Sequence, residues 1–524
     1  MVYDKSLFSM NKPNKPKRRS STLKKTRQNY LAGGLILIAL FWSVLYLPNL
    51  RTSPPWYGDE ILTLDIGRSL IRGEMVNRAM YCTFASFNYN YQPAFAFFVG
   101  LGSSLTEGDI LGGRLVSVSL ALFTAWLGYW FLGRRFGFGC GLFFALLLLG
   151  YSQAIIHYRW IYPHNMVGLG LLAATCLLMR PANARKDIKA GLFLCLGAGS
   201  HLLALHSVLV SITLRFFRPR CWFSIGLPPL LVMGGTILTI NFIWNGWALE
   251  DLENLRKTYQ AYSQENASRW KWLENIVMFF IQDRFHWAAA VGAVICLRKR
   301  TYSLALGALC MVFILTKNRQ NLPLFYYQAM VVLPLLAAMI AVASRFICNT
   351  TFRHIVAFRY KSIRRVLLPF LGVCLALINI PSVLSSKLPV RIHPWVVTEN
   401  RDYETAASWL NARTKPSDLV ICYWNLGWML KSQNADVLMV TAWHGLPAGD
   451  NYNPLPARDR FRFSLEINKA KYFVITELDE RWAYGQGSVF DFLKNSGVFS
   501  WPLVFQSGFV RILQNPYFLN DFQK

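Results

Sequence analysis

Two acidic residues, Asp59 and Glu60, stand side by side in "WYGDEILTLDIGRSLIRGE" (56–74), directly after the first long apolar stretch of the chain. A carboxylate held in a fixed position can act as a general base and take a proton from a hydroxyl or an amine. The same residues can simply start a helix, with Asp59 as the N-cap and Glu60 facing the positive end of the helix dipole. The apolar pattern that follows predicts a helix lying in the membrane interface. The two interpretations are compatible, because a helix start would hold a base rigidly.

The composition indicates a membrane protein. Of the 524 residues, 54% are hydrophobic and only 16% are charged, whereas soluble proteins carry about 25% charged residues. Several apolar runs approach the roughly 17–25 residues that span a bilayer. The formal net charge of +28 could indicate nucleic acid, but the basic residues cluster between apolar segments, as in cytoplasmic loops. We therefore expect an α-helical polytopic membrane protein with no nucleic-acid partner.

The basic runs also assign a side of the membrane to each loop. Residues 1–28 predict a disordered basic cytoplasmic tail, followed by an uncleaved first span over 30–47 and a first external loop over 50–111. Basic residues flank 190–214 on both sides, which favours two short helices broken near "GAGSHLLALH" over one ordinary span. With about eleven spans in all, the remaining ones are expected at 112–132, 139–156, 164–179, 222–243, 284–297, 301–316, 325–343 and 366–383.

The composition changes near residue 385. We expect a transmembrane domain over 29–384 and a small external α/β domain over 385–524. In the latter, "RDYETAASWLNAR" predicts an amphipathic helix, "LVICYW", "ADVLMV" and "KYFVIT" predict strands, and "SVFDFLKNSG" predicts a helix ended by Gly497. This domain has no glycine-rich phosphate-binding motif. Support, a lid or acceptor contact is the role expected for this domain.

The order of several motifs resembles that of the GT-C membrane glycosyltransferases, in the branch of the protein O-mannosyltransferases and the lipid A aminoarabinose transferases. The resemblance rests on Asp59-Glu60, "YNYQPAFAFF" (89–98), "GGRLVSVSLALF" with Arg114, and "GRRFGFGCG" (133–141). The segment "HYRWIYPHNMVGL" resembles the next external corner of the family. The resemblance covers residues 30–215.

This resemblance implies a polyprenyl-phosphate-sugar donor, a glycan, lipid or protein acceptor, and transfer of a hexosyl or pentosyl group on the outer face with inversion. Asp59 would be the catalytic base, with Glu60 as the alternative carboxylate. No cofactor is implied, and the residues do not indicate a divalent metal. The donor phosphate would be bound by cations and by one histidine, namely Arg114, Arg159, His201, Lys317 and Arg319. Some relatives carry a second acid near a Pro-Pro element, but "NYNYQPA" has none, which adds Glu74, Tyr91 and Gln92 as first-loop candidates.

Three other classes of membrane protein stay open at this stage. One is a non-catalytic assembly protein, in which the C-terminal domain would be the working part. A transporter or flippase would show internal repeats and ionisable groups at mid-span, whereas here nearly all acids fall in loops. A polymerase or ligase of lipid-linked glycans would use a large late external loop, for which 244–275 is available. The topology fits a bacterial inner membrane with a cytoplasmic N-terminus and an external active site. If this assignment holds, Asp59, Arg114, Arg159 and His201 should converge on one external site.

Overall fold

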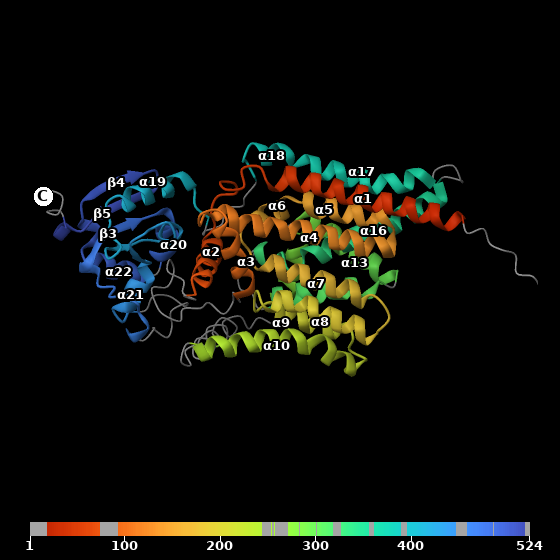
Figure 1. Ribbon diagram of the computed structural model, residues 1–524, viewed down its shortest axis with the longest axis horizontal. Helices are drawn as coiled ribbons and strands as arrows, with labels where there is room; N and C mark the ends of the chain where they lie inside the picture. The colour runs from red at the N-terminus through yellow and green to blue at the C-terminus, as the bar shows by residue number, and fades with distance from the viewer. Residues whose placement is uncertain are drawn as a thin grey trace, which may run out of the picture.

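A bundle of helices carries a small α/β domain at one end in the computed structural model (Figure 1). Two helices of the first loop, α2 (Gly58–Ile71) and α3 (Pro93–Ser104), lie where the bundle meets this domain. The structure describes residues 18–73, 93–243, 253, 256, 271–281, 283–299, 301–317, 326–355, 361–388, 396–446, 458–485 and 487–518.

The bundle is built from apolar helices of unequal length. Four described helices are long and apolar enough to cross a membrane, or up to five if the bent pair α5 and α6 counts as one span, and further apolar helices are shorter. The number of about eleven spans therefore stays a prediction. The described helices of the bundle are α1 (Arg18–Tyr46), α4 (Ile110–Phe136), α5 (Phe138–Gly150), α6 (Ser152–Arg159), α7 (His164–Leu178), α8 (Ala184–Ala198), α9 (Ala204–Thr213), α10 (Pro219–Ile243), α12 (Lys271–Ile281), α13 (Arg284–Arg298), α14 (Tyr302–Lys317), α15 (Tyr326–Ala329), α16 (Leu333–Ile355), α17 (Lys361–Ile378) and α18 (Ile380–Leu384).

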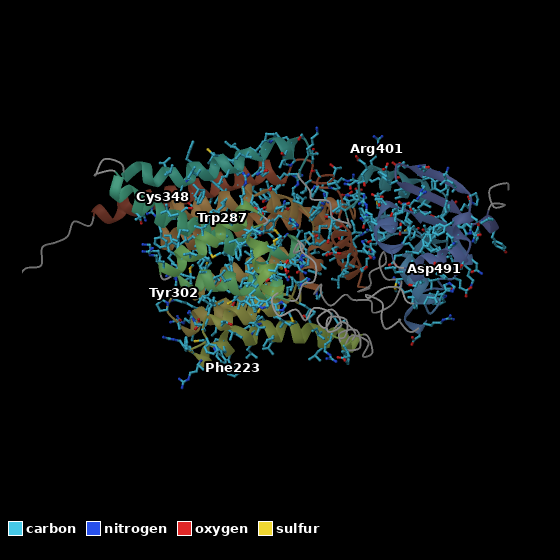
Figure 2. The ribbon with its side chains drawn as sticks, turned by 180° about the vertical axis from the view of Figure 1, so that it is seen from behind. Phe223, Trp287, Tyr302, Cys348, Arg401 and Asp491 are labelled. Carbon is cyan, nitrogen blue, oxygen red and sulfur yellow. The ribbon has the colours of Figure 1, made fainter. Side chains whose placement is uncertain are left out.

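Large apolar side chains cover the outside of the bundle. Phe223 and Trp287 are 76% and 60% exposed, and Figure 2 shows both on the bundle, with Arg401 and Asp491 on the C-terminal domain. An apolar surface of this extent on one part of a protein is typical of contact with lipid. The surface therefore agrees with an integral membrane protein.

The segment 190–214 forms two helices, as the flanking basic residues indicated. Helices α8 and α9 are interrupted around His201. Asp187, at the start of α8, forms an ion pair with Arg215, just after α9, with 3.3 Å between Oδ1 and Nε. The Arg215 guanidinium also donates to the carbonyl oxygens of Leu178 and Arg180 at the end of α7. The two helices therefore form a hairpin whose flanks lie together.

Helix α2 differs from the sequence-based prediction in its surroundings. The apolar pattern predicted a helix lying in the interface, but ten of its residues are buried. The close contact with α3 depends on glycines, because a Cβ atom on Gly67 would overlap the backbone of Ala96 and Gly100. Contacts with the C-terminal domain bury the other side. Arg68, for example, donates to the Trp428 carbonyl oxygen over 2.9 Å.

The C-terminal domain contains a five-stranded sheet in the order β2-β1-β3-β5-β4. Strands β1 (Leu419–Ile421), β2 (Gln433–Ala435) and β3 (Ala470–Ile475) are parallel, whereas β4 (Leu503–Ser507) and β5 (Val510–Gln514) add an antiparallel edge. The predicted helices are present as α19 (Asn400–Asn411) and α22 (Gly487–Asn495), and Gly497 has a φ of 71°. The remaining short elements are α20 (Trp424–Gly427), α21 (Val437–Trp443), the 3-10 turns Arg458–Arg460, Ile467–Lys469 and Val498–Ser500, and the π-helical turn Asp479–Ala483.

The strand predicted for "ADVLMV" is wrong. Only Ala435 belongs to a strand, and α21 begins two residues later. The cause is Asp436, whose Oδ1 accepts hydrogen bonds from the backbone N–H groups of Leu438 and Met439 at 2.8 and 2.9 Å. Such an N-cap favours a helix over the strand that the apolar run alone suggested.

The hairpin of α8 and α9 makes a prediction about membrane sides. Cysteines introduced as Arg185→Cys and Arg218→Cys, both at exposed positions, should react with a membrane-impermeant maleimide from the same side, because their segments are tied by the Asp187–Arg215 pair. A Lys415→Cys control in the C-terminal domain should react from the opposite side. Labelling of positions 185 and 218 from opposite sides would show that α8 and α9 together cross the membrane once.

Candidate functional site

The two acidic residues of "WYGDEIL" face different surroundings. Tyr57, not Asp59, is the N-cap of α2, so the predicted N-cap role of Asp59 is wrong. Asp59 is half-buried, whereas the Glu60 side chain is completely buried. Successive residues of a helix point about 100° apart. The helix start therefore directs one carboxylate to the inside of the protein and leaves the other partly accessible.

Glu60 is bound from three sides inside the protein. Its Oε1 accepts from Nη2 of Arg114 at 2.5 Å and from the backbone N–H of Tyr57 at 3.0 Å. Its Oε2 accepts from Nε of Arg114 at 3.0 Å and from the backbone N–H of Ile161 at 3.3 Å. Burial raises the pKa of the Glu60 carboxyl, and the Arg114 guanidinium and the two N–H groups act against this rise. Helix α2, helix α4 and the chain after α6 are thus joined at one carboxylate.

The predicted phosphate ligands Arg114 and Arg159 are both fully buried and bonded to the protein. Both guanidinium groups donate hydrogen bonds to protein oxygen atoms. Binding of the donor phosphate by these two residues stays a prediction that the arrangement does not favour. Nη1 of Arg114 and the three nitrogens of Arg159 donate to carbonyl oxygens at the end of α1 and in the turn after it, namely those of Leu45, Pro48, Leu50, Ser53 and Pro54.

A row of rings leads from Asp59 to His201. The Tyr57 hydroxyl donates to Oδ2 of Asp59 at 3.2 Å. The Tyr57 ring lies 5.3 Å from Tyr162, which lies 5.8 Å from His164, and His164 lies 4.3 Å from His201. Of the four residues expected to converge, Asp59 and His201 are therefore connected through this row, whereas Arg114 and Arg159 bond to Glu60 and to backbone carbonyl groups.

His201 lies in the break between α8 and α9 and is 6% exposed. Its Nδ1 accepts from the backbone N–H of Leu203 at 3.0 Å, so the hydrogen of a neutral ring sits on Nε2. The start of α3 meets the same break, because the backbone N–H of Ala94 donates to the Gly199 carbonyl oxygen at 2.8 Å. The proline element and the broken pair, singled out separately in the sequence, are thus neighbours.

Several predicted site residues are not placed by these contacts. Lys317 is the last residue of α14. The others lie outside the described residues, namely Glu74, Tyr91, Gln92 and Arg319. Within the described part of the chain, no group of three or more metal-ligating side chains is present, and metal dependence stays untested.

Sequence reasoning missed Tyr57, Tyr162 and His164. Each stands within a few residues of a motif that was noted, in "WYGDEIL" or "HYRWIYPHN". The signal was the density of aromatic and histidine residues in both motifs. A charged side chain is the more obvious phosphate ligand, so the motifs pointed to the arginines instead.

These features define a polytopic membrane protein with a partly accessible carboxylate and a polar helix break at the end of the bundle that meets the C-terminal domain. No protein-family profile matches the chain, and no curated protein matches it by sequence.

Solved structures do match it over nearly its whole length. The crystal structure of ArnT from Cupriavidus metallidurans in the apo state has a TM-score of 0.57 and 12% identity, and the match covers 94% of this chain and 98% of ArnT. The crystal structure of the same ArnT bound to undecaprenyl phosphate has a TM-score of 0.54 and 14% identity, covering 93% of this chain and 98% of ArnT. The GT-C fold predicted from the sequence is therefore confirmed.

The buried ion pair generates a stability prediction. Glu60→Gln should lower the free energy of unfolding by about 3–5 kcal/mol, because it leaves the buried Arg114 charge without a counter-charge. The matched control is Glu480→Gln, which removes an exposed pair with Arg511 and should cost less than about 1 kcal/mol. Thermal unfolding of the purified proteins in detergent measures both. Equal losses for the two variants would contradict the assignment of Glu60 as a structural centre.

Proposed function

We propose that this chain is an integral membrane glycosyltransferase that moves a sugar from a polyprenyl-phosphate donor to an acceptor on the outer face of the membrane. The observation that carries the proposal is the separation of Asp59 from Glu60. One carboxylate holds the structure together. The other is half-buried at a helix start and is linked to the polar helix break through the rings of Tyr57, Tyr162 and His164. The match to ArnT bound to undecaprenyl phosphate supports the class of donor.

Asp59 is the general base in this proposal. Its position in the first turn of α2 fixes the backbone, and the hydrogen bond from Tyr57 to Oδ2 fixes the carboxylate. The other oxygen can accept the proton of an acceptor hydroxyl or amine. Deprotonation makes the acceptor a stronger nucleophile.

The chemical step exchanges one bond at the anomeric carbon for another. The acceptor oxygen or nitrogen forms a bond to this carbon, and the bond between the carbon and the phosphate oxygen breaks. The electron pair leaves with the lipid phosphate, which is a good leaving group and needs no general acid. Attack opposite the leaving group inverts the configuration.

The donor phosphate would lie at the break between α8 and α9. In this proposal, Nε2–H of His201 donates to the phosphate, and His164 lies beside the His201 ring. A polar side chain in a broken membrane helix indicates a ligand site. Lys317 and Arg319 stay as further proposed phosphate ligands from the sequence, and the acceptor is a glycan, a lipid or a protein.

Replacement of Asp59 tests the proposal. Asp59→Asn should reduce transfer by about 10²–10⁴-fold, the contribution of a positioned base, with thermal unfolding unchanged. The assay follows radiolabelled undecaprenyl-phosphate-linked hexose, pentose and aminopentose in membranes and measures label leaving the lipid. Asp491→Asn is the control, because it makes the same acid-to-amide change at an exposed site of the C-terminal domain. Full activity of Asp59→Asn with a confirmed donor would overturn the base assignment.

A further inference from the structure

The C-terminal domain contacts the turn that precedes α2. The Asn400 side chain, at the start of α19, donates to the Thr52 carbonyl oxygen at 3.1 Å and accepts from the Trp56 N–H at 2.8 Å. The backbone N–H of Val397 donates to the Trp56 carbonyl oxygen at 3.0 Å. The domain therefore binds both polar groups of the Trp56 backbone, three residues before Asp59.

The sequence of this turn explains why a side chain from another domain bridges it. The turn reads "TSPPW" (52–56), and Pro54 and Pro55 have no backbone N–H. These two residues cannot donate hydrogen bonds that would close the turn on itself. An asparagine amide offers a donor and an acceptor on one short side chain. Asn400 uses the donor at one end of the turn and the acceptor at the other, and it is only 7% exposed.

The segment 396–400, which carries Asn400, is fixed within its own domain. The backbone N–H of Thr398 donates to Oε1 of Glu477 at 2.8 Å. Nη1 of Arg481 donates to the Val396 carbonyl oxygen at 3.2 Å. The segment is therefore part of the folded C-terminal domain and presents a defined surface to the turn.

The contact reaches Asp59 through Tyr57. Tyr57 follows Trp56 and is the N-cap of α2. It pairs with Val396 in an antiparallel β-bridge, and its backbone N–H donates to Oε1 of Glu60 at 3.0 Å. Its hydroxyl donates to Oδ2 of Asp59 at 3.2 Å. The backbone that carries Tyr57 and Asp59 is thus fixed from one side by the bundle and from the other side by the C-terminal domain.

We infer that Asn400 is a positioning residue for Asp59. It fixes the path by which the chain enters α2, and this path sets the direction of the Tyr57 phenol and of the Asp59 carboxylate. The C-terminal domain thereby contributes to catalysis without supplying a reacting group. The consequence for catalysis rests on the proposed function, whereas the contact between the domain and the turn does not.

Hydrogen–deuterium exchange of the full-length protein in detergent tests the contact and needs no substrate. A peptide covering residues 53–57 suits the measurement, because Pro54 and Pro55 carry no amide hydrogen and few amides besides that of Trp56 contribute. Asn400→Leu should raise the exchange rate of the Trp56 amide by about ten-fold, the effect of losing about one hydrogen bond.

The matched control is Asn411→Leu. Asn411 lies in the same helix as Asn400, and its side chain also bonds to two backbone groups, the carbonyl oxygen of Met429 and the N–H of Lys431. Both of these partners belong to the C-terminal domain. This variant should therefore destabilise the domain to a similar degree and leave the exchange rate at Trp56 unchanged.

Sugar transfer tests the positioning role. Asn400→Leu should lower kcat by about 10–10²-fold, because displacing a reacting group by about 1 Å can cost about 10²-fold. The KM for the donor lipid should stay unchanged, and Asn411→Leu should keep the wild-type kcat. Added to Asp59→Asn, Asn400→Leu should cause no further loss, because it acts through a carboxylate that is already absent. A further loss of the same size would overturn the inference.

Two other results would also overturn it, namely Trp56 exchange at the wild-type rate in Asn400→Leu, and a wild-type kcat beside faster exchange. If this variant does not fold, Val397→Pro replaces it, because proline removes the N–H that bonds to the Trp56 carbonyl oxygen. The same faster exchange and lower kcat are then expected. Faster exchange together with full transfer by Asp59→Asn would uphold the contact and reject the proposed base, which keeps the two failures distinguishable.

Discussion

The ion pair between Glu60 and Arg114 is the interaction on which the rest of the site depends. Both side chains are completely buried, and a buried charge is tolerated only when its partner and its remaining hydrogen bonds are in place. This requirement fixes helix α2 against α4 and the chain at Ile161. Because Arg114 also binds the turn after α1, a single pair sets the relative positions of the first loop and the bundle.

Helical geometry also determines the direction of Asp59 once the Glu60–Arg114 pair has formed. Since Glu60 must point to Arg114, its neighbour Asp59 must point elsewhere, and its carboxylate accepts from the Tyr57 hydroxyl. Arg159 binds the end of α1 and the same turn through three backbone carbonyl groups. Arg114 and Arg159 therefore affect the proposed reaction only indirectly, because they fix the backbone that carries the proposed base.

The parts of this architecture that local sequence determines could be predicted. Apolar length located α4 and α10, and basic flanks indicated the α8–α9 hairpin, because solvent preference acts on each segment separately. The partner of Arg114 could not be predicted, since Glu60 lies 54 positions away in the sequence and an arginine at a span end suits a phosphate equally well. The burial of α2 also depends on a domain that begins more than 300 residues later. Helix α21 is a different case. Asp436 is a typical N-cap residue and indicates a helix, whereas the apolar run after it suggested a strand.

A structure of the chain with undecaprenyl phosphate bound is the most direct test of this account. The account predicts that the phosphate lies at the break between α8 and α9, within hydrogen-bond distance of His201, and that the Glu60–Arg114 pair stays intact. Asp59 should then face the position that the anomeric carbon of a donor would occupy. A phosphate bound by Arg114 or Arg159, with Glu60 displaced from its partner, would contradict the division between a structural and a chemical carboxylate.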